Sequence, residues 1–206
     1  MDGEGSVSES VSSSVLYMSM SLDGFIAGPG DDAEHGLGIG GERLHEWLGE
    51  WVGSPSGIRP PGASAEVFEA FMATGAVVVG RRTFDYAGHW NGDHHNGVPI
   101  FVPTRGKPPE RPASELVHYV TDGVEGAVRR AKEAAGDKDV MVHGADLTQS
   151  LLRAGMLDEL QIHLVPVLLG DGRRLFEHLG ADHIELEPIR VTEAPGVTHL
   201  RYRVMG

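Results

Sequence analysis

The run Ala76–Val79 and the four residues that follow it constrain this chain more than any other stretch. An alanine and three valines, with no polar residue between them, predict a strand buried on both faces, as in a sheet covered by helices. Gly80 lets the chain turn sharply at the strand's end, and Thr83 is placed to cap a short helix whose free N–H groups favour an anion. Arg81 and Arg82 add charge suited to phosphate. This junction predicts a nucleotide-phosphate site, although a turn with two solvated arginines fits the motif equally well.

A second junction of the same kind lies further along the chain. Residues 139–142 are predicted as a strand and residues 147–153 as a helix. The residues between them are His143, Gly144, Ala145 and Asp146. Small residues at this point admit a phosphate to a helix N-terminus. Two such junctions, with strands and helices in alternation, predict an α/β sandwich that binds its ligand at the carboxyl ends of the strands.

The remaining pattern completes this prediction. Further strands are predicted at residues 15–20, 98–102, 117–120, 160–169, 183–192 and 197–205, and further helices at 42–51, 64–74, 123–135 and 173–179. The last two strands flank a turn at residues 193–196, which predicts an antiparallel hairpin that closes the sheet. Pro166 predicts a kink or an edge position for its strand, and Ser64 is a candidate helix N-cap. The Gly/Pro-rich residues 53–62 are interpreted as a mobile loop that could close over a site.

Several polar and aromatic residues have two interpretations. Thr104 and Arg105 follow a predicted strand and could reach a ribose phosphate, or form a solvated turn. A stripe on helix 42–51 fits core packing better than a cofactor site. Its members are Leu44, Trp47, Leu48 and Trp51. A metal site among the histidines of residues 86–97 is disfavoured because their spacing matches no known metal helix. His163, His183 and His199 are interpreted as structural or exposed.

Composition limits the class of protein. The 206 residues suit one domain, and a net charge of -13 argues against a nucleic-acid partner. The absence of cysteine excludes disulfides and thiolate chemistry, and fits the cytoplasm. No apolar run is long enough to span a membrane, and the acidic N-terminus does not resemble a signal peptide. Residues 1–13 are predicted to be a disordered tail and residues 14–206 the folded domain.

At this point several motifs, in order, resemble those of the dihydrofolate reductase superfamily. The motifs are Ser21–Ala27, Gly80–Thr83, Asp158–Leu160 and Pro166–Gly172. The chain is most similar to the reductase domain of the bifunctional riboflavin-biosynthesis deaminase/reductase, over residues 15 to 205. The resemblance implies a three-layer sandwich with a mixed, mostly parallel central sheet and a C-terminal antiparallel hairpin. It also implies a homodimer that uses NADPH to reduce a small molecule.

The resemblance also implies roles for individual residues. Ala27 would meet the nicotinamide end of NADPH, and the Gly80–Thr83 motif its adenosine phosphates. Residues 143–147, from His143 to Leu147, would line the pyrophosphate. Asp23 would lie near the reacting centre, although capping the turn at Gly24 is an equal alternative.

Substrate-binding positions depart from the family pattern. Dihydrofolate reductases carry an acidic residue that binds the pterin and aids its protonation. The corresponding position in this chain is Ser64, with Glu66 two residues later. Phe25 stands where the riboflavin-pathway reductases have a lysine that binds the substrate phosphate. His143 stands where they have a glutamate directly before the glycine pair. Together with Trp47 and Trp90, these replacements indicate an apolar or aromatic substrate. The predicted function is an NADPH-dependent reductase, in the manner of 5-amino-6-(5-phosphoribosylamino)uracil reductase. The alternative is a non-catalytic module that binds a nucleotide or another ligand on the same fold.

Overall fold

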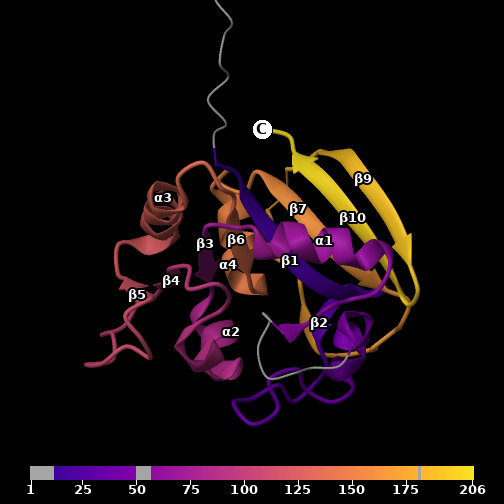
Figure 1. The fold of residues 1–206 in the computed structure, drawn as a ribbon, viewed down its shortest axis with the longest axis horizontal. Coiled ribbons are helices and arrows are strands. Elements are labelled where there is room, and N and C mark those ends of the chain that lie inside the picture. Colours follow the sequence, from indigo (N-terminus) through magenta and orange to yellow (C-terminus); the bar gives the residue numbers. More distant parts are fainter. Residues whose placement is uncertain (1–11, 50–56, 181) are drawn as a thin grey trace, which may run out of the picture.

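The computed structural model describes residues 12–49, 57–180 and 182–206, which form an eight-stranded sheet. Its order is β5-β4-β3-β6-β1-β7-β10-β9 (Figure 1). The strands are β1 (Ser14–Ser21), β3 (Ala76–Val79), β4 (Ile100–Pro103), β5 (Val117–Val120), β6 (Val140–His143), β7 (Glu159–Val165), β9 (Leu186–Ala194) and β10 (Val197–Val204). The first six strands in this order, from β5 at the edge through to β7, run parallel to one another. Strand β10 is antiparallel to both β7 and β9. The mixed, mostly parallel sheet and the C-terminal hairpin are therefore confirmed.

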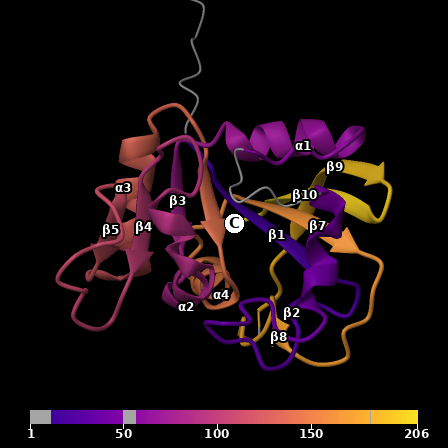
Figure 2. The ribbon, with the colours of Figure 1, turned by 60° about the horizontal axis from the view of Figure 1, so that its bottom comes forward.

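Helices cover both faces of the sheet (Figure 2). Successive side chains of a strand point to opposite faces, so alternate strand residues meet each helical layer. The helices are α1 (Ala63–Met72), α2 (Arg81–Tyr86), α3 (Gly123–Ala135) and α4 (Ala145–Arg153), with a 3-10 helix η1 (Gly41–Leu48). Leu16 of β1 packs with α3 and α4, whereas Tyr17 packs on the other face, against Phe71 of α1. This three-layer arrangement confirms the fold class implied by the resemblance.

Two short strands form a second, small sheet that the sequence did not indicate. Strand β2 (Phe25–Ala27) pairs with β8 (Arg173–Arg174), and this pairing joins the first glycine-rich loop to the segment after residue 170. The helix predicted at 173–179 is wrong, because the chain extends along β2 here. Strands of two or three residues have too little periodicity to be recognised.

Other predicted details also change. Strand β7 ends at Val165 and the chain bends at Pro166, so the predicted kink is present but lies just after the strand. Strand β7 lies between β1 and β10, so the alternative of an edge position is wrong. Helix α1 has Gly62 as its N-cap and ends at Met72. Ser64 is not the cap, because its hydroxyl lies 2.9 Å from His199 Nε2 instead.

The segment before the sheet and the ends of the chain complete the description. Leu44 and Trp47 of η1 are buried, as the predicted stripe required, whereas Trp51 lies outside the described residues. Of the predicted mobile loop, residues 53–56 lie outside the described residues, and Ile58 in the described part is buried. Residues 1–11 of the predicted tail also lie outside them, whereas the hydroxyl of Ser12 donates to the Lys138 carbonyl at 2.6 Å. Among the described segments, no helix combines the length and apolar character needed to cross a membrane.

Candidate cofactor and substrate site

The two strand–helix junctions lie side by side at the carboxyl edge of the sheet. Strands β3 and β6 are parallel neighbours, and their last paired residues are Val79 and His143. The Gly80 N–H donates to the His143 carbonyl at 3.1 Å, which ties the two turns together. Carboxyl ends of adjacent parallel strands form the usual ligand-binding edge of an open α/β sheet. The sequence-predicted cofactor residues at these two junctions are therefore brought together.

Gly144 is held in a conformation that other residues avoid. Its φ is +100° and its ψ +144°, which is strongly unfavourable for a residue with a Cβ atom. A Cβ atom built on Gly144 would lie 2.6 Å from Thr83 Oγ1 of the neighbouring turn. Thr83 therefore packs over Gly144, and its predicted role as a helix cap is wrong. Helix α2 begins two residues earlier, after Gly80, with no side-chain cap hydrogen bond.

Helix α4 begins directly after this glycine. The Gly144 carbonyl accepts hydrogen bonds from the Thr148 N–H at 3.0 Å and its hydroxyl at 2.7 Å, which fixes the first turn. Asp146 is exposed, whereas Ala145 and Leu147 are buried in the main core. The Leu147 side chain faces that core, so only its backbone is available to a ligand.

The two arginines of the first junction are engaged with carboxylates. Arg81 Nε donates to Asp85 at 2.8 Å and 2.9 Å, and its guanidinium lies 5.2 Å from the ring centre of Tyr119. Arg82 Nη2 lies 2.9 Å from Asp31 Oδ1. Both side chains stay partly exposed, 39% for Arg81 and 41% for Arg82, so the alternative interpretation of two solvated arginines remains open. A bound phosphate would share or replace these carboxylate partners.

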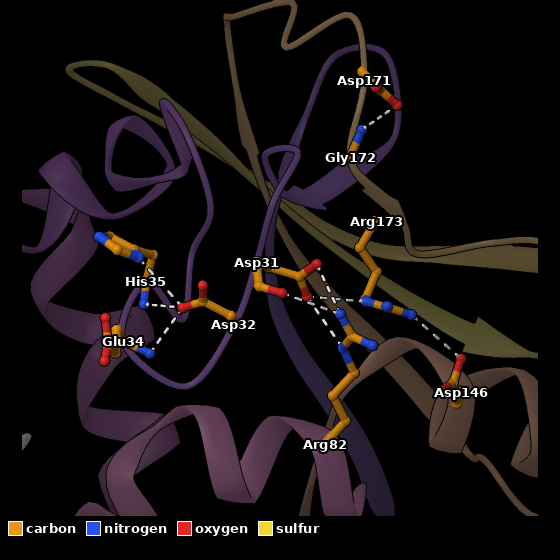
Figure 3. A network of polar contacts seen from close by, with 9 residues as sticks. All are labelled: Asp31, Asp32, Glu34, His35, Arg82, Asp146, Asp171, Gly172 and Arg173. Atoms are coloured by element: carbon orange, nitrogen blue, oxygen red, sulfur yellow. Dashed lines mark hydrogen bonds and ion pairs between the residues drawn. The ribbon is translucent and has the colours of Figure 1, made fainter.

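Asp31 is the centre of a charged network that the sequence did not indicate (Figure 3). Its carboxylate, only 14% exposed, contacts Arg82 from α2 and Arg173 from β8, the latter at 3.3 Å. Arg173 also lies 3.8 Å from Asp146 at the start of α4. A cavity of about 120 Å³ adjoins the network. Its lining residues are Asp31, Asp146, Gln149, Gly172, Arg173, Arg174 and Glu177. The arginine pair after a glycine turn was the one available sequence signal for this region.

Thr104 and Arg105 follow β4, the neighbour of β3, so they lie at the same edge of the sheet. The Thr104 N–H donates to the Val120 carbonyl at 2.8 Å, and Arg105 is exposed. Both positions are compatible with a role in holding a cofactor phosphate, and this role remains a prediction.

Asp23 holds two loops together. Its carboxylate accepts hydrogen bonds from the Ser21 hydroxyl at 2.6 Å and from the Leu169 and Gly170 N–H groups at 3.1 Å and 2.7 Å. The hydroxyl and the two N–H donors lower its pKa to about 2. Such a carboxylate stays ionised near neutral pH, so it can orient a group but is a poor proton donor.

The predicted substrate residues are scattered. Phe25 is buried beneath the guanidinium of Arg174, which lies 4.4 Å from its ring centre. Trp47 is buried and donates to the Ser19 hydroxyl at 3.0 Å. Glu66 lies on the exposed side of α1, where it pairs with Arg190 of β9 at 2.7 Å. Glu66 therefore cannot replace the missing acid of dihydrofolate reductases, and that prediction is wrong.

Ala27, predicted to meet the nicotinamide, is buried on β2, with its carbonyl beside Gly172. A Cβ atom on Gly172 would lie 2.1 Å from that carbonyl oxygen, so the two loops are in tight contact. Ala27 pairs with Arg173 between β2 and β8, and Arg173 is a member of the charged network around Asp31.

A group of buried histidines on the α1 face is the main feature that sequence reasoning missed. Two pairs share short contacts: Nδ1 of His94 lies 2.7 Å from Nδ1 of His95, and Nδ1 of His163 lies 2.8 Å from Nδ1 of His199. The His143 ring lies 5.1 Å from that of His94. Burial lowers the pKa of each, so these imidazoles are neutral near pH 7. The interpretation of the later histidines as structural or exposed is confirmed, since His163 and His199 are buried and His183, which lies before β9, is exposed.

Trp90 joins this group from a strained turn. The segment η3 (Gly88–Gly92) holds three successive non-glycine residues with φ between +47° and +58°, among them Trp90. The ring of Trp90 lies 4.4 Å from that of His94 and 6.1 Å from that of His143. A left-handed backbone at a bulky residue is unfavourable and often marks a functional position. Among the described residues, no group of three or more potential ligands is arranged to hold a metal ion.

Comparison with known proteins identifies the family of this chain. The pattern of the RibD C-terminal domain matches residues 14–200. The chain belongs to this family. It is 27% identical over 172 residues to an uncharacterized protein, YwjB, of Bacillus subtilis, and the match covers 80% of this chain and 83% of that protein.

Solved structures of this family share its fold. A putative riboflavin biosynthesis protein from Shewanella sp. PV-4 superposes with a TM-score of 0.70 at 20% identity, over 94% of this chain and 99% of that one. A pyrimidine reductase-like protein from Corynebacterium diphtheriae gives a TM-score of 0.59 at 12% identity, over 96% and 93%. The bifunctional deaminase and 5-amino-6-(5-phosphoribosylamino)uracil reductase of Thermotoga maritima also gives 0.59, at 14% identity, over 94% of this chain and 57% of that one. These likenesses show that the chain shares its fold with the three proteins.

Proposed function

We propose that this protein is an NADPH-dependent oxidoreductase that reduces a small planar substrate. The observation that carries the proposal is the contact between the two strand–helix turns, where Gly144 lies under Thr83 beside the start of α4. Helix N-termini and adjacent arginines favour phosphate groups, and a dinucleotide supplies several of them. The cofactor itself supplies the hydride. The residues of the chain would hold it at this edge and exclude water around the reacting atoms.

Arginine side chains near this edge support NADPH over NADH. Arg81 and Arg105 lie on neighbouring turns, and a guanidinium can bind the additional 2′-phosphate of NADPH with two hydrogen bonds. A charge-assisted hydrogen bond is worth about 1.5–3 kcal/mol, which corresponds to roughly ten- to hundredfold in affinity. The test is a calorimetric titration with NADPH and, separately, NADH.

The variants Arg81→Gln and Arg105→Gln should weaken NADPH at least tenfold and leave NADH unchanged. Arg129→Gln is the matched control, because Arg129 is an exposed arginine of α3 that pairs with Asp122 and Glu133. Absence of binding by either dinucleotide would refute the proposal. Equal losses for NADPH and NADH would refute the role of these two arginines.

A phosphate-bearing substrate, as in the riboflavin pathway, gains support from Arg174. Phe25 replaces the lysine that binds the substrate phosphate in those reductases, but the Arg174 guanidinium stands over its ring and returns a positive charge to this position. We therefore propose that substrates resembling 5-amino-6-(5-phosphoribosylamino)uracil be tested first, by oxidation of NADPH in their presence. Arg174→Gln should raise KM for a phosphorylated substrate and leave NADPH binding unchanged.

One observation favours the alternative of a non-catalytic binding module. The two carboxylates predicted near the substrate, Asp23 and Glu66, offer no proton donor, since Asp23 stays ionised and Glu66 lies outside the site. Tight NADPH binding without turnover on pterins, pyrimidines or quinones would identify the protein as such a module.

A further inference from the structure

Two buried side-chain polar atoms of the described residues have no hydrogen-bond partner, and both belong to histidines. They are Nδ1 of His45, on η1, and Nε2 of His143, at the end of β6. Native proteins pair nearly all their buried polar groups, so each exception calls for an explanation. The two imidazoles come from segments almost a hundred residues apart. Of the two, His143 adjoins the second glycine turn.

The protonation of His143 follows from its surroundings. Burial lowers its pKa to about 4, so the ring is neutral at pH 7, with one N–H and one lone pair. A backbone hydrogen bond to Tyr17 favours the protonated ring and therefore involves a carbonyl acceptor. Because Nε2 has no partner, the N–H that meets this carbonyl is on Nδ1. The Nε2 atom is then an unused hydrogen-bond acceptor.

The environment of this acceptor is aromatic. The rings of Phe71 and Trp90 each lie 6.1 Å from the His143 ring, and that of His94 lies 5.1 Å away. Aromatic side chains stack on flat rings and exclude water around a hydrogen bond. The strained left-handed backbone at Trp90 holds one of these rings in place. An unprotonated Nε2 atom offers no hydrogen-bond donor to a phosphate, which needs donors and positive charge.

We propose that Nε2 of His143 recognises the substrate, by accepting a hydrogen bond from an N–H or O–H group on an uncharged, planar heterocyclic ring. This inference rests on the proposed function, because His143 directly precedes Gly144 and so adjoins the turn assigned to the cofactor. His143 is thus a specificity-determining residue at a position where the related reductases carry a glutamate.

The test compares two probes that differ in one hydrogen-bond donor. Quinazolin-4(3H)-one is flat, uncharged and carries a ring N–H, and 3-methylquinazolin-4-one lacks that donor. Binding of each is measured by ligand-observed NMR with the full chain, with and without NADPH. The variant His143→Asn keeps a donor near the Nδ1 position and removes the acceptor, whereas His143→Gln returns an acceptor close to the Nε2 position. His178→Asn, at an exposed residue, is the matched control.

We expect the N–H probe to bind the native chain and the control roughly three- to tenfold more tightly than it binds His143→Asn, the ordinary worth of one neutral hydrogen bond. His143→Gln should recover most of this difference, and the methylated probe should bind all variants equally weakly. In long-range ¹H–¹⁵N spectra, the free protein should show an unprotonated His143 Nε2 whose resonance shifts when the N–H probe is added.

Several results would overturn the inference. They are a protonated Nε2 in the free protein, equal affinity of both probes for the native chain, no loss in His143→Asn, and no binding of the N–H probe under either condition. A resonance that the probe leaves unmoved would assign the acceptor to an internal water. The NADPH titration is separate: its failure with intact probe binding would refute the proposed function alone, and the reverse pattern would refute only this inference.

Discussion

Replacement of Gly144 by alanine tests the geometry on which the cofactor site depends. The backbone at φ +100° and ψ +144° costs a residue with a Cβ atom about 1–3 kcal/mol. The new Cβ atom would also lie 2.6 Å from Thr83 Oγ1, and relief of such an overlap in a packed region typically costs another ~1–3 kcal/mol. The expected loss in the free energy of unfolding is therefore about 2–6 kcal/mol.

Two further variants separate the backbone contribution from the overlap. Gly155→Ala is the matched control, because Gly155 also has a positive φ, +63°, but a Cβ atom there meets nothing within 4 Å. Thr83→Ala removes the hydroxyl that the new Cβ atom would approach. In the Thr83→Ala background, Gly144→Ala should cost less by the overlap contribution, a coupling of about 1–3 kcal/mol.

The assay is urea unfolding of the four chains of this cycle and of the control, followed by circular dichroism. For a chain of this length each 1 kcal/mol corresponds to roughly 2–4 °C in Tm, so thermal melts provide an independent check. NADPH affinity should fall with Gly144→Ala, because the displaced turn carries the start of α4. The reasoning is refuted if Gly144→Ala loses no more stability than Gly155→Ala and shows no coupling to Thr83→Ala.

Three further predictions follow from the described contacts. First, His45, His143 and His199 have pKa values lowered to about 4 by burial, so the unfolded chain binds protons before the folded one does. The free energy of unfolding should lose nothing through these groups above about pH 6.5 and should fall as the pH drops from 6.5 to 4; equal urea midpoints at pH 7.5 and pH 5 would contradict this. Second, Asp23→Asn should lower Tm at pH 7, because the carboxylate accepts hydrogen bonds from Ser21 and from residues 169–170. An unchanged Tm would refute the stabilising role of these hydrogen bonds. Any reductase activity of the native chain should show no ionisation of Asp23 between pH 5 and 8. Third, we propose a homodimer that buries the β9 face opposite α1, where Ile189 is 42% and Val191 58% exposed; Val191→Glu should yield a monomer by sedimentation velocity, and a native chain that is already monomeric at micromolar concentration would refute the dimer.

Much of the fold could be predicted because its elements are locally encoded. The apolar run of β3 predicts a strand buried on both faces, and the structure confirms it with all four residues fully buried. The turn at residues 193–196 predicts the C-terminal hairpin, since alternating strands on either side of it leave few other pairings. The two glycine junctions were recognised for the same reason, because each needs a sharp turn at a strand end.

The candidate site was predicted only in part, because its contacts join residues distant in sequence. Asp31 meets Arg82 and Arg173 through loops whose arrangement no periodicity encodes, and β2 and β8 are too short to leave a pattern. Glu66 was misplaced because its position along α1 did not reveal which side of the helix faces the sheet.

The sequence by itself determined the strands of the main sheet, their order along the chain and the two glycine turns, since these depend on local backbone preference and on which residues are apolar. Tertiary structure alone decided which side chains meet. The parallel pairing of β3 with β6 places Thr83 over Gly144, and the packing of η1 onto the sheet brings Trp47 to Ser19 of β1. The charge state of the buried histidines follows from desolvation, which exists only once the chain has folded around them.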